Sequence, residues 1–521
     1  MKRRLAALAL AGALGLTAGC QDFLDVNTNP NAPERVAANL YLPPLLHWMV
    51  TTQAWDGRCT SQYTQMLTQS GFSTYDIHGT NLNTDTCGEQ WRTTYWIFGQ
   101  NLIDMMDRAE AEKRWDILGA GYVMKAWGWL QTTNLHGEII VKQAFNQGTS
   151  FTFDYDTQEV AYEETKRMLD SAIVYLGMTG DAVDATFMAR GDKMYNGDRL
   201  KWLKFAHGLY AIALSHYSNK SSYDPQAIIA HVDQSFTSNA DDALWSFPNL
   251  QNDDRNFMGP SRNNYMSYRQ TRFIVGLLNG TVFGTEDPRM RRMLATSPDS
   301  IYRGLSVGES FTALPAAQRA NNPAGYEVVP PTGSPGLYLF GDVVKFPAMT
   351  YSQLQFVKAE AAFRAGNKTL ALQAHRNGVS SHVDFVNDRN RETGRANFPP
   401  ISAAEKAALL ANTEIVPADP SALTLQQIMS QKFIAQWGWA YNEAWMDMRR
   451  YHYTDLDPAV GEPVFPGWEM PTTIASANNG KLAYRLRPRY NSEYVWNAPA
   501  LEKIGGLALD YNTVIPWILQ P

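Results

Sequence analysis

Hydrophobic and polar residues alternate with a helical period over six long segments of the chain. In these segments apolar residues recur three and four positions apart, which places them on one face of an α-helix. The segments are 91–112, 115–135, 162–177, 196–218, 351–367 and 424–450. The pattern therefore predicts a mostly α-helical protein.

One stretch predicts how such helices pair. AEAAFRAGNKTLALQAHRNGV, residues 359–379, reads as an alanine-rich helix, a Gly366-Asn367 turn and a second helix. Small side chains on both halves let paired helices approach closely; they are Ala361, Ala362, Ala371 and Ala374. This is the pattern of a tetratricopeptide-like hairpin, although no regular period marks a simple solenoid.

Long irregular stretches separate the helical segments. Residues 235–275, 295–345 and 455–500 are rich in Gly, Pro, Asn and aromatic residues. Loops of this length in a compact protein are usually functional or packed on a scaffold. The predicted fold class is mostly α, a tetratricopeptide-like helical hairpin scaffold with long loop embellishments. No low-complexity linker divides 37–521, which we expect to form a single domain.

The first residues resemble a lipoprotein leader. Basic residues 2–4 precede an apolar run, 5–16, that is shorter than the roughly 20 residues a membrane-spanning helix needs. Small residues then lead into Cys20, as in a bacterial lipobox. We expect residues 1–19 to be a lipoprotein signal peptide, Cys20 to be lipidated, and 20–36 to be a tether. The alternative is an ordinary signal peptide cut nearby.

The charge balance argues against nucleic acid as a partner. Removal of the expected signal peptide takes Lys2, Arg3 and Arg4 away from 45 Lys and Arg, leaves 51 Asp and Glu, and moves the net charge from −6 to −9. Phosphate binding needs a basic face, and this composition does not supply one.

The two remaining cysteines, Cys59 and Cys87, admit two interpretations. In an oxidising compartment they could form one disulfide, which their polar, loop-like surroundings favour. The alternative is two unrelated buried thiols.

Motifs for catalysis, metals and cofactors are missing from the sequence. It contains no HExxH, no phosphate-binding P-loop and no GxGxxG fingerprint. One GxSxG occurs at 304–308, but no buried strand precedes it and no helix follows, so we interpret it as a chance match. The acidic pairs Asp241-Asp242 and Asp253-Asp254 are adjacent loop residues. We therefore expect no enzyme, no metal and no cofactor.

Aromatic and amide side chains in the apparent loops suggest ligand binding instead. Three stretches, 51–65, 70–84 and 244–270, mix Trp and Tyr with Asn, Asp and Arg. Such a mixture can stack on sugar faces and bond hydroxyl groups, or anchor a peptide. The predicted ligand-binding residues are Trp55, Tyr75, Trp245, Arg255, Asn263, Tyr265 and Tyr268. The alternative is that many of these aromatic residues pin loops to the core.

Several segments resemble one known family in chain order. CQDFLDVNTNPNAP, from Cys20, is similar to the start of mature SusD/RagB-like outer-membrane lipoproteins. Further resemblances are WRTTYWIFGQNLIDMM, NGDRLKWLKFAHGLYAIALSHYS, MTYSQLQFVKAEAAFRAG, IMSQKFIAQWGWAYNEAWMDMRR and RLRPRYNSEYVWN. Gln353 replaces a usual Glu, and Asn491 stands where Pro is common. The resemblance extends from Cys20 to Asn497.

The resemblance implies a location, a partner and a ligand. It implies a lipid-anchored protein of the cell outer membrane that faces the extracellular side. There it would act as the lid of a SusC-type TonB-dependent outer-membrane transporter and capture an oligosaccharide or peptide for import.

Two other hypotheses stay open. One is a surface glycoside hydrolase or lyase of mainly α architecture, and the other is a purely structural assembly lipoprotein.

We expect the helically spaced residues Glu443, Trp445, Arg449 and Arg450 to be structural and to hold the last helix to the scaffold.

Overall fold

The computed structural model describes residues 36–69, 85, 87–146, 148, 150–310, 312, 314–395 and 399–521. The expected signal peptide, Cys20, nearly all of the tether and Tyr75 lie outside these residues.

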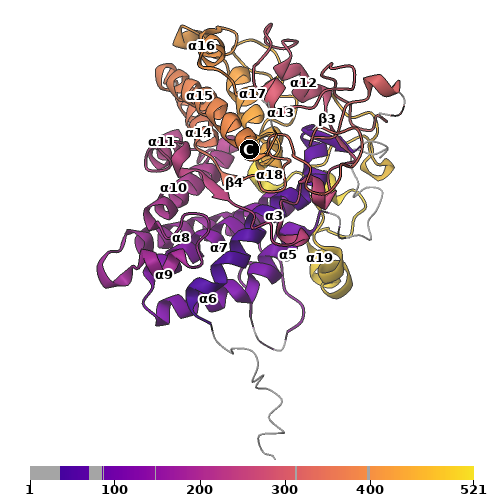
Figure 1. The fold of residues 1–521 in the computed structure, drawn as a ribbon. Helices are drawn as coiled ribbons and strands as arrows, with labels where there is room; N and C mark the ends of the chain where they lie inside the picture. The colour runs from indigo at the N-terminus through magenta and orange to yellow at the C-terminus, as the bar shows by residue number, and fades with distance from the viewer. Residues whose placement is uncertain are drawn as a thin grey trace, which may run out of the picture.

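The described chain is mostly helical, which confirms the predicted fold class (Figure 1). The helices are α3 (Leu42–Tyr63), α5 (Glu89–Arg92), α6 (Gly99–Ala111), α7 (Trp115–His136), α8 (Gln158–Gly177), α9 (Ala185–Ala189), α10 (Arg199–Ser215), α11 (Pro225–Asp233), α12 (Arg272–Leu278), α13 (Met290–Met293), α14 (Tyr351–Arg364), α15 (Lys368–Glu392), α16 (Ala403–Ala411), α17 (Leu425–Gln436), α18 (Tyr441–Arg450) and α19 (Ala498–Lys503). Among the described residues, no helix combines the length and apolar character that crossing a membrane requires.

Strands are few and short. β1 (Leu67–Gln69) pairs antiparallel with β3 (Tyr268–Gln270), and β2 (Ala243–Trp245) pairs antiparallel with β4 (Phe346–Met349). Each pair joins segments that lie far apart in the sequence. The strands therefore fasten the long loops to the scaffold and build no extended sheet.

The predicted hairpin is formed by α14 and α15. Gly366 turns the chain with φ +78°, and the Asn367 side chain accepts a hydrogen bond from the backbone N–H of Leu370 at 3.1 Å, which caps α15. Gly378 lies against the ring of Phe356, where a Cβ would come within 2.7 Å of the ring. Close approach of the two helices thus follows from small residues on both.

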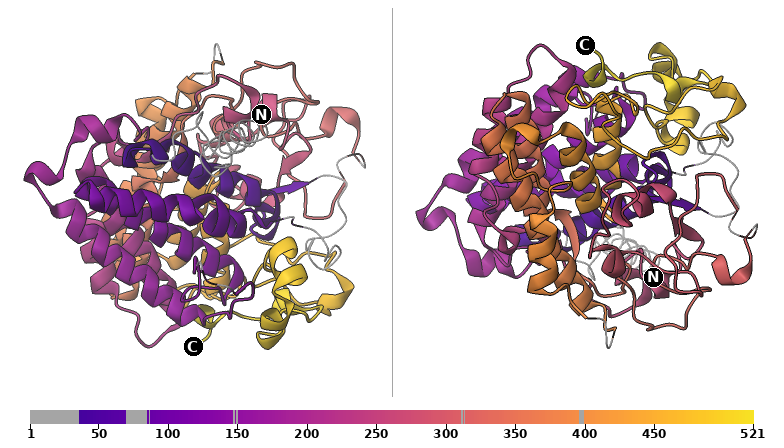
Figure 2. Two further views of the ribbon diagram at one scale, coloured as in Figure 1. Left: turned by 90° about the horizontal axis from the view of Figure 1, so that it is seen from below. Right: turned by 90° about the horizontal axis from the view of Figure 1, so that it is seen from above.

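Helical pairs occupy one side of the molecule and the long loops the other. α7 packs along α8 and α14 along α15, while α10 and α11 connect the two pairs. In Figures 1 and 2 these helices stack side by side, and the loop stretches 295–345 and 455–500 gather on the opposite side with α19. α3 and α18 lie between the two parts.

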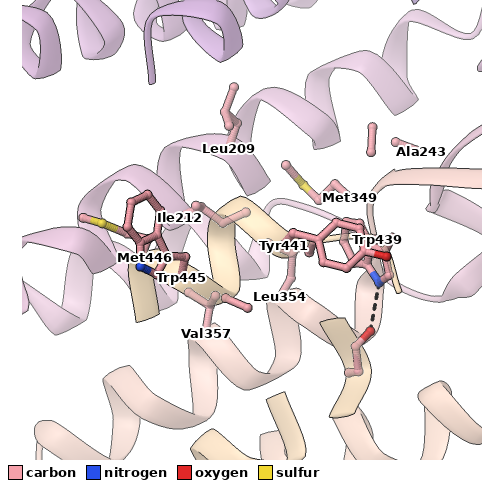
Figure 3. Close-up of a cluster of buried hydrophobic side chains, with 14 of the residues drawn as sticks. Leu209, Ile212, Ala243, Met349, Leu354, Val357, Trp439, Tyr441, Trp445 and Met446 are labelled. Atoms are coloured by element: carbon pink, nitrogen blue, oxygen red, sulfur yellow. Dashed lines mark hydrogen bonds between the residues drawn. The ribbon is translucent and has the colours of Figure 1, made fainter. Parts of the chain in front are cut away.

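The core joins the helical side to α18 through one continuous cluster of buried hydrophobic residues. Figure 3 shows part of it, where Leu209 and Ile212 from α10 face Leu354 and Val357 from α14. Trp445 from α18 is fully buried in the same region. Burial of a side chain of this size contributes several kcal/mol, so α18 is a central support of the fold.

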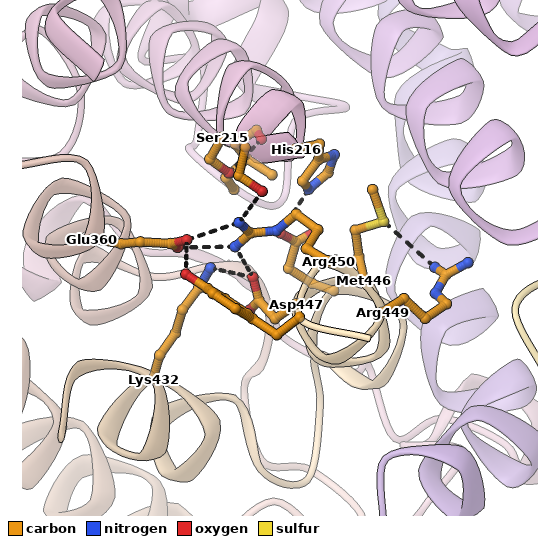
Figure 4. Close-up of polar contacts among 12 residues, drawn as sticks. Ser215, His216, Glu360, Lys432, Met446, Asp447, Arg449 and Arg450 are labelled. Carbon is orange, nitrogen blue, oxygen red and sulfur yellow. Dashed lines mark hydrogen bonds and ion pairs between the residues drawn. The ribbon is translucent and has the colours of Figure 1, made fainter. Parts of the chain in front are cut away.

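Buried charges connect α18 to its neighbours (Figure 4). Arg450 donates to both carboxylate oxygens of Glu360 on α14, at 2.8 and 2.9 Å. Glu443 lies 2.9 Å from the His216 ring, and Arg449 stacks over Trp445 at 3.9 Å. These contacts agree with the structural role expected for the helically spaced residues of this segment.

The stretch 51–65 departs from expectation, because most of it forms the end of α3 instead of a loop. Several of its polar residues are buried and bonded to distant segments: Thr60 donates to the Asn442 side chain at 3.0 Å, and Asp56 accepts from the backbone of α5. A helix that is enclosed on several sides and carries polar residues inside the protein has no amphipathic pattern to detect.

Candidate functional site

An exposed tryptophan, Trp96, separates two cavities on the surface beside α3 and α5. One cavity measures about 370 Å³ and the other about 380 Å³, and both are lined by Arg92 and Trp96. The Trp96 side chain is 65% exposed. We call the two cavities and the ridge between them the Trp96 groove.

The first cavity has an apolar floor and a polar rim. The apolar lining consists of Trp91, Tyr95, Ile140, Ala144, Phe145 and Phe153, and the polar lining of Arg92, Gln143, Asn146, Arg489, Ser492 and Glu493, of which Glu493 is buried. The second cavity is lined by Leu40, Tyr41, Pro44, Leu45, Trp48, Arg92, Trp96, Ile97 and Asn101. An apolar lining with a few convergent polar groups is typical of a small-ligand site.

A π-helical turn, η2 (Thr93–Phe98), directs two adjacent aromatic residues differently. The Tyr95 hydroxyl donates to the carbonyl oxygen of Ile140 at 2.7 Å and accepts from its N–H at 2.9 Å, so this ring is fixed in the floor. Trp96 follows at once and remains largely exposed. A second π-helical turn, η12 (Tyr490–Tyr494), supplies Ser492 and Glu493 to the rim. π-turns are rare and are frequent at functional sites.

Arg92 holds Trp96 in place. Its guanidinium carbon lies 4.3 Å from the centre of the Trp96 ring and 5.5 Å from that of Trp48, and Nη1 donates to Glu89 at 2.6 Å. A guanidinium over an indole face is a favourable cation–π arrangement. The ridge is therefore preorganised, while most of the indole is available to a ligand.

The charged side chains around the groove already have partners within the protein. Arg92 is paired with Glu89, and Arg489 lies 3.0 Å from Asp85. Glu493 accepts from the Tyr155 hydroxyl at 2.5 Å; burial and this carboxylate together raise the pKa of Tyr155 well above its usual value. The surface thus suits a ligand without a strong net charge.

Few carboxylates line the groove. Within the part of the chain that the structure describes, Glu493 is the one carboxylate lining either cavity, whereas glycoside hydrolysis uses two. Ser306 of the GxSxG match accepts from Arg272 at 2.9 Å and donates to Glu469 at 3.1 Å. The described residues include no cluster of three or more His, Cys, Asp or Glu side chains suited to a metal ion.

Other exposed aromatic residues lie near the first cavity. Phe151 and Trp496 are 86% and 73% exposed. Their neighbours in the chain, Phe153 and Asn497, are joined by two hydrogen bonds of 3.0 Å between the Asn497 side chain and the Phe153 backbone. This face therefore presents aromatic surface beyond Trp96 itself.

A third cavity, of about 410 Å³, lies between α13 and α16. Its lining is largely polar, and its charged residues are already engaged: Arg291 pairs with Glu286 at 2.7 Å, and Glu405 closes the N-terminal cap of α16. It offers no exposed aromatic ring, so we favour the Trp96 groove.

Three of the predicted ligand-binding residues are buried. Trp245, Tyr265 and Tyr268 are at most 4% exposed. Tyr265 donates to the backbone carbonyl of Ala54 at 2.6 Å and Tyr268 to that of Arg58 at 3.0 Å, so both rings pin the loop to α3. Their predicted role as ligand contacts is not supported, because protein atoms already surround them.

Three further predicted residues that the structure describes, Trp55, Arg255 and Asn263, do not line the groove either. Trp55 is half-buried against Phe257, with ring centres 4.8 Å apart. Arg255 donates to the Asn249 side chain at 2.7 Å, and Asn263 is exposed at the end of a short 3₁₀ turn.

The prediction missed the aromatic residues of WRTTYWIFGQ. Trp91, Tyr95 and Phe98 are spaced for one buried helix face, whereas Trp96 falls outside that face, and this is the signal that could have located the groove.

The structure joins Cys59 and Cys87 in a disulfide with Cα atoms 6.0 Å apart. Cys59 belongs to α3 and not to a loop as the sequence suggested, and Cys87 lies just before α5. The bridge thus ties the central helix to the segment that leads into the groove.

Comparison with known proteins finds a matching family model and solved structures of similar fold. The model of a family described as SusD-like, "Starch-binding associating with outer membrane", matches residues 30–485. A SusD/RagB family protein from Bacteroides thetaiotaomicron is similar over 93% of this chain and 99% of its own, with 21% identity and a TM-score of 0.69. A chitin-binding SusD homolog from Flavobacterium johnsoniae is similar over 92% and 98%, with 18% identity and a TM-score of 0.65. A structure named only as a chitin-binding protein gives 19% identity, a TM-score of 0.69, and the same 92% and 98% coverage. No curated protein sequence matches the chain.

Proposed function

The chain belongs to the SusD-like family of non-catalytic outer-membrane nutrient-binding proteins, and from this membership we propose that it binds an oligosaccharide in the Trp96 groove. The observation that carries the proposal is the indole of Trp96, exposed between two cavities and held by Arg92. Sugar rings present apolar C–H faces that stack on an indole, while their hydroxyl groups bond polar side chains. Cavities on both sides of the ridge suit a chain of several sugar units.

The lining favours a neutral sugar that carries a small apolar substituent. The first cavity is floored by aromatic and aliphatic side chains, and its charged rim residues are paired within the protein. An N-acetyl group would place its methyl on this floor and its amide at the polar rim. Two proteins of similar fold are named as chitin-binding. Oligomers of N-acetylglucosamine are therefore the first ligands to test, and an aromatic peptide is the alternative occupant.

The test compares the wild type with Trp96→Ala in titrations with chitohexaose. Loss of an aromatic stacking surface should weaken binding by roughly tenfold. Because the side chain is largely exposed, the unfolding temperature should stay unchanged. Leu250→Ala, at an 86% exposed position that lines neither cavity, is the matched control. Equal affinity of Trp96→Ala and the wild type would reject the groove as the site.

The proposal extends to anchoring and partnership. Lipidated Cys20 and the tether 20–36 would hold the protein on the outer face of the membrane, as the lid of a SusC-type TonB-dependent transporter. This role fits a binding protein without catalytic groups, since capture has to be followed by import. Purification of the lipidated, tagged protein from outer membranes in mild detergent should recover a transporter barrel in equal amount. A Cys20→Ala variant should lose the membrane fraction, and recovery without any barrel would reject the lid role.

A further inference from the structure

One face of α3 holds the segment that supplies Trp91 and Arg92 to the Trp96 groove and leads into Trp96. Along this face Trp48, Thr52, Asp56 and Cys59 follow one another at steps of three and four residues, so they form one stripe on the helix. Each contacts the segment 87–93, which runs antiparallel to α3. We call these four residues the α3 stripe.

The contacts between the α3 stripe and residues 87–93 follow one another along the helix. Cys59 is bonded to Cys87. Asp56 accepts from the backbone N–H groups of Glu89 and Gln90 at 3.1 and 2.7 Å. Farther along, the Thr52 and Thr93 hydroxyl groups lie 2.5 Å apart, and Arg92 lies over Trp48. Thr52 and Asp56 are fully buried, so water does not compete for these bonds.

The same segment also fixes the opposite wall of the first cavity. Asp85, two residues before Cys87, pairs with Arg489 at 3.0 Å. Its carboxylate also accepts from the backbone and side-chain amides of Asn491, at 3.2 and 2.8 Å. Arg489 and the following residues of η12 line the cavity. The position of Trp96 therefore depends on where residues 87–93 are held, and that of Arg489 on its pairing with Asp85.

The backbone conformation at Cys87 and at the start of α5 requires support from another segment. Cys87 has φ +65°, a left-handed conformation that is unfavourable for a residue with a Cβ. No side chain of its own caps the start of α5, and Asp56 of α3 supplies the acceptor instead. Residues 87–93 thus take their conformation from contacts with α3.

We propose that Thr52, Asp56 and the Cys59–Cys87 disulfide are positioning residues of the Trp96 groove, so that reduction of the disulfide weakens ligand binding while the protein stays folded. This inference rests on the proposed function, because it assigns a redox dependence to that same groove. None of the positioning residues lines either cavity. They act through Arg92, Trp96 and Arg489.

The first experiment follows hydrogen exchange and needs no ligand. Peptides covering 87–98 and 487–494 should exchange faster after reduction and in the Cys59→Ser/Cys87→Ser variant. Peptides from α14 and α15 should be unchanged, and reductant should have no further effect on the double variant. Unchanged exchange in both groove peptides would overturn the proposal. Faster exchange throughout the protein would also overturn it, because the bridge would then be a general stabiliser.

The second experiment measures affinity for chitohexaose under conditions in which every variant is folded. Asp56→Ala removes both bonds and should weaken binding by about fivefold, the fold-change that corresponds to the typical stability of a helix cap being lost from the groove. Asp56→Asn keeps one acceptor and should restore part of the affinity. Val383→Ala, in the buried part of α15, is the control for general destabilisation and should bind as the wild type does.

The two experiments separate the positioning role from the proposed function. If wild-type protein does not bind chitohexaose, the ligand assignment fails, and the exchange data alone decide whether the α3 stripe positions the groove. If the probe binds equally to the wild type, Asp56→Ala and the reduced protein, the positioning role fails although the ligand assignment stands.

Discussion

Replacement of Glu360 by Gln tests the buried charges that hold α18 in place. Glu360 and Arg450 are almost completely buried, and their two hydrogen bonds measure 2.8 and 2.9 Å. An amide can accept one of these bonds, but its NH₂ group would face the guanidinium with like donors. Asp447 alone would then neutralise both Arg450, at 2.7 Å, and Lys432, at 2.8 Å.

The expected loss is large because an uncompensated charge stays buried. Removal of one partner of a buried pair costs about 3–5 kcal/mol. The unfolding entropy of a chain this long is about 1 kcal/mol/K, so the midpoint temperature of thermal unfolding should fall by about 3–5 °C. The pair Lys503–Asp154 is matched in distance, at 2.6 Å, but both side chains are more than half exposed. Asp154→Asn should therefore cost less than about 1 kcal/mol.

Urea unfolding followed by tryptophan fluorescence measures both losses, and pH provides a second check. Burial alone would raise the pKa of Glu360, but Arg450, Lys432 and Arg364 hold it well below its usual value. Its contribution is therefore complete above about pH 4.5 and declines as the pH falls further, so the deficit of Glu360→Gln should narrow in acid. A loss no larger than that of Asp154→Asn, or a deficit that widens in acid, would refute this reasoning.

Two further predictions concern stability. Burial raises the pKa of Asp242 to about 8, so the stability from its protonated form is present at low pH and is lost as the pH rises through that value. The free energy of unfolding of the wild type should fall by about 2–3 kcal/mol between pH 6 and pH 9 through this group, and that of Asp242→Asn should not. An equal change with pH in the two proteins, measured by urea unfolding, would contradict this. Gly57→Ala would press a Cβ into the ring of Tyr441 and the hydroxyl group of Tyr265 and should cost about 1–3 kcal/mol, whereas Gly276→Ala, in a helix with open space, should stabilise by up to about 1 kcal/mol. Calorimetric unfolding temperatures of the two alanine variants should therefore move in opposite directions.

Local sequence predicted the parts of the fold that depend on near neighbours. The α14–α15 hairpin follows from small residues and a Gly-Asn turn within a short stretch, and its cap is made by Asn367 itself. α3 could not be predicted in this way. It buries polar residues that bond to distant partners, such as Asn442 for Thr60, so its sequence reads as a loop.

The sequence predicted which types of residue form the candidate site, but not which positions in the chain supply them. Aromatic residues beside polar ones do form a groove, but exposure depends on contacts that one stretch of sequence does not specify. Tyr265 and Tyr268 are buried because α3 carbonyl groups accept from their hydroxyl groups. Trp96 is exposed although it lies in the same π-turn as its neighbour Tyr95, because the two side chains leave the turn in different directions.

The pairing of α3 with α18 has a consequence for how the chain folds. Tyr63 packs on Trp445 with ring centres 4.8 Å apart, so the first long described helix completes its core only with residues near the other end. Hairpins such as α14–α15 close over short distances and can form early, whereas contacts this far apart form slowly. A nascent chain that has not yet reached Tyr441 leaves the α18-facing side of α3 without its partner. The central helix would therefore be among the last elements to settle, and chains truncated before α18 should be targets for chaperones and proteases rather than smaller binding proteins.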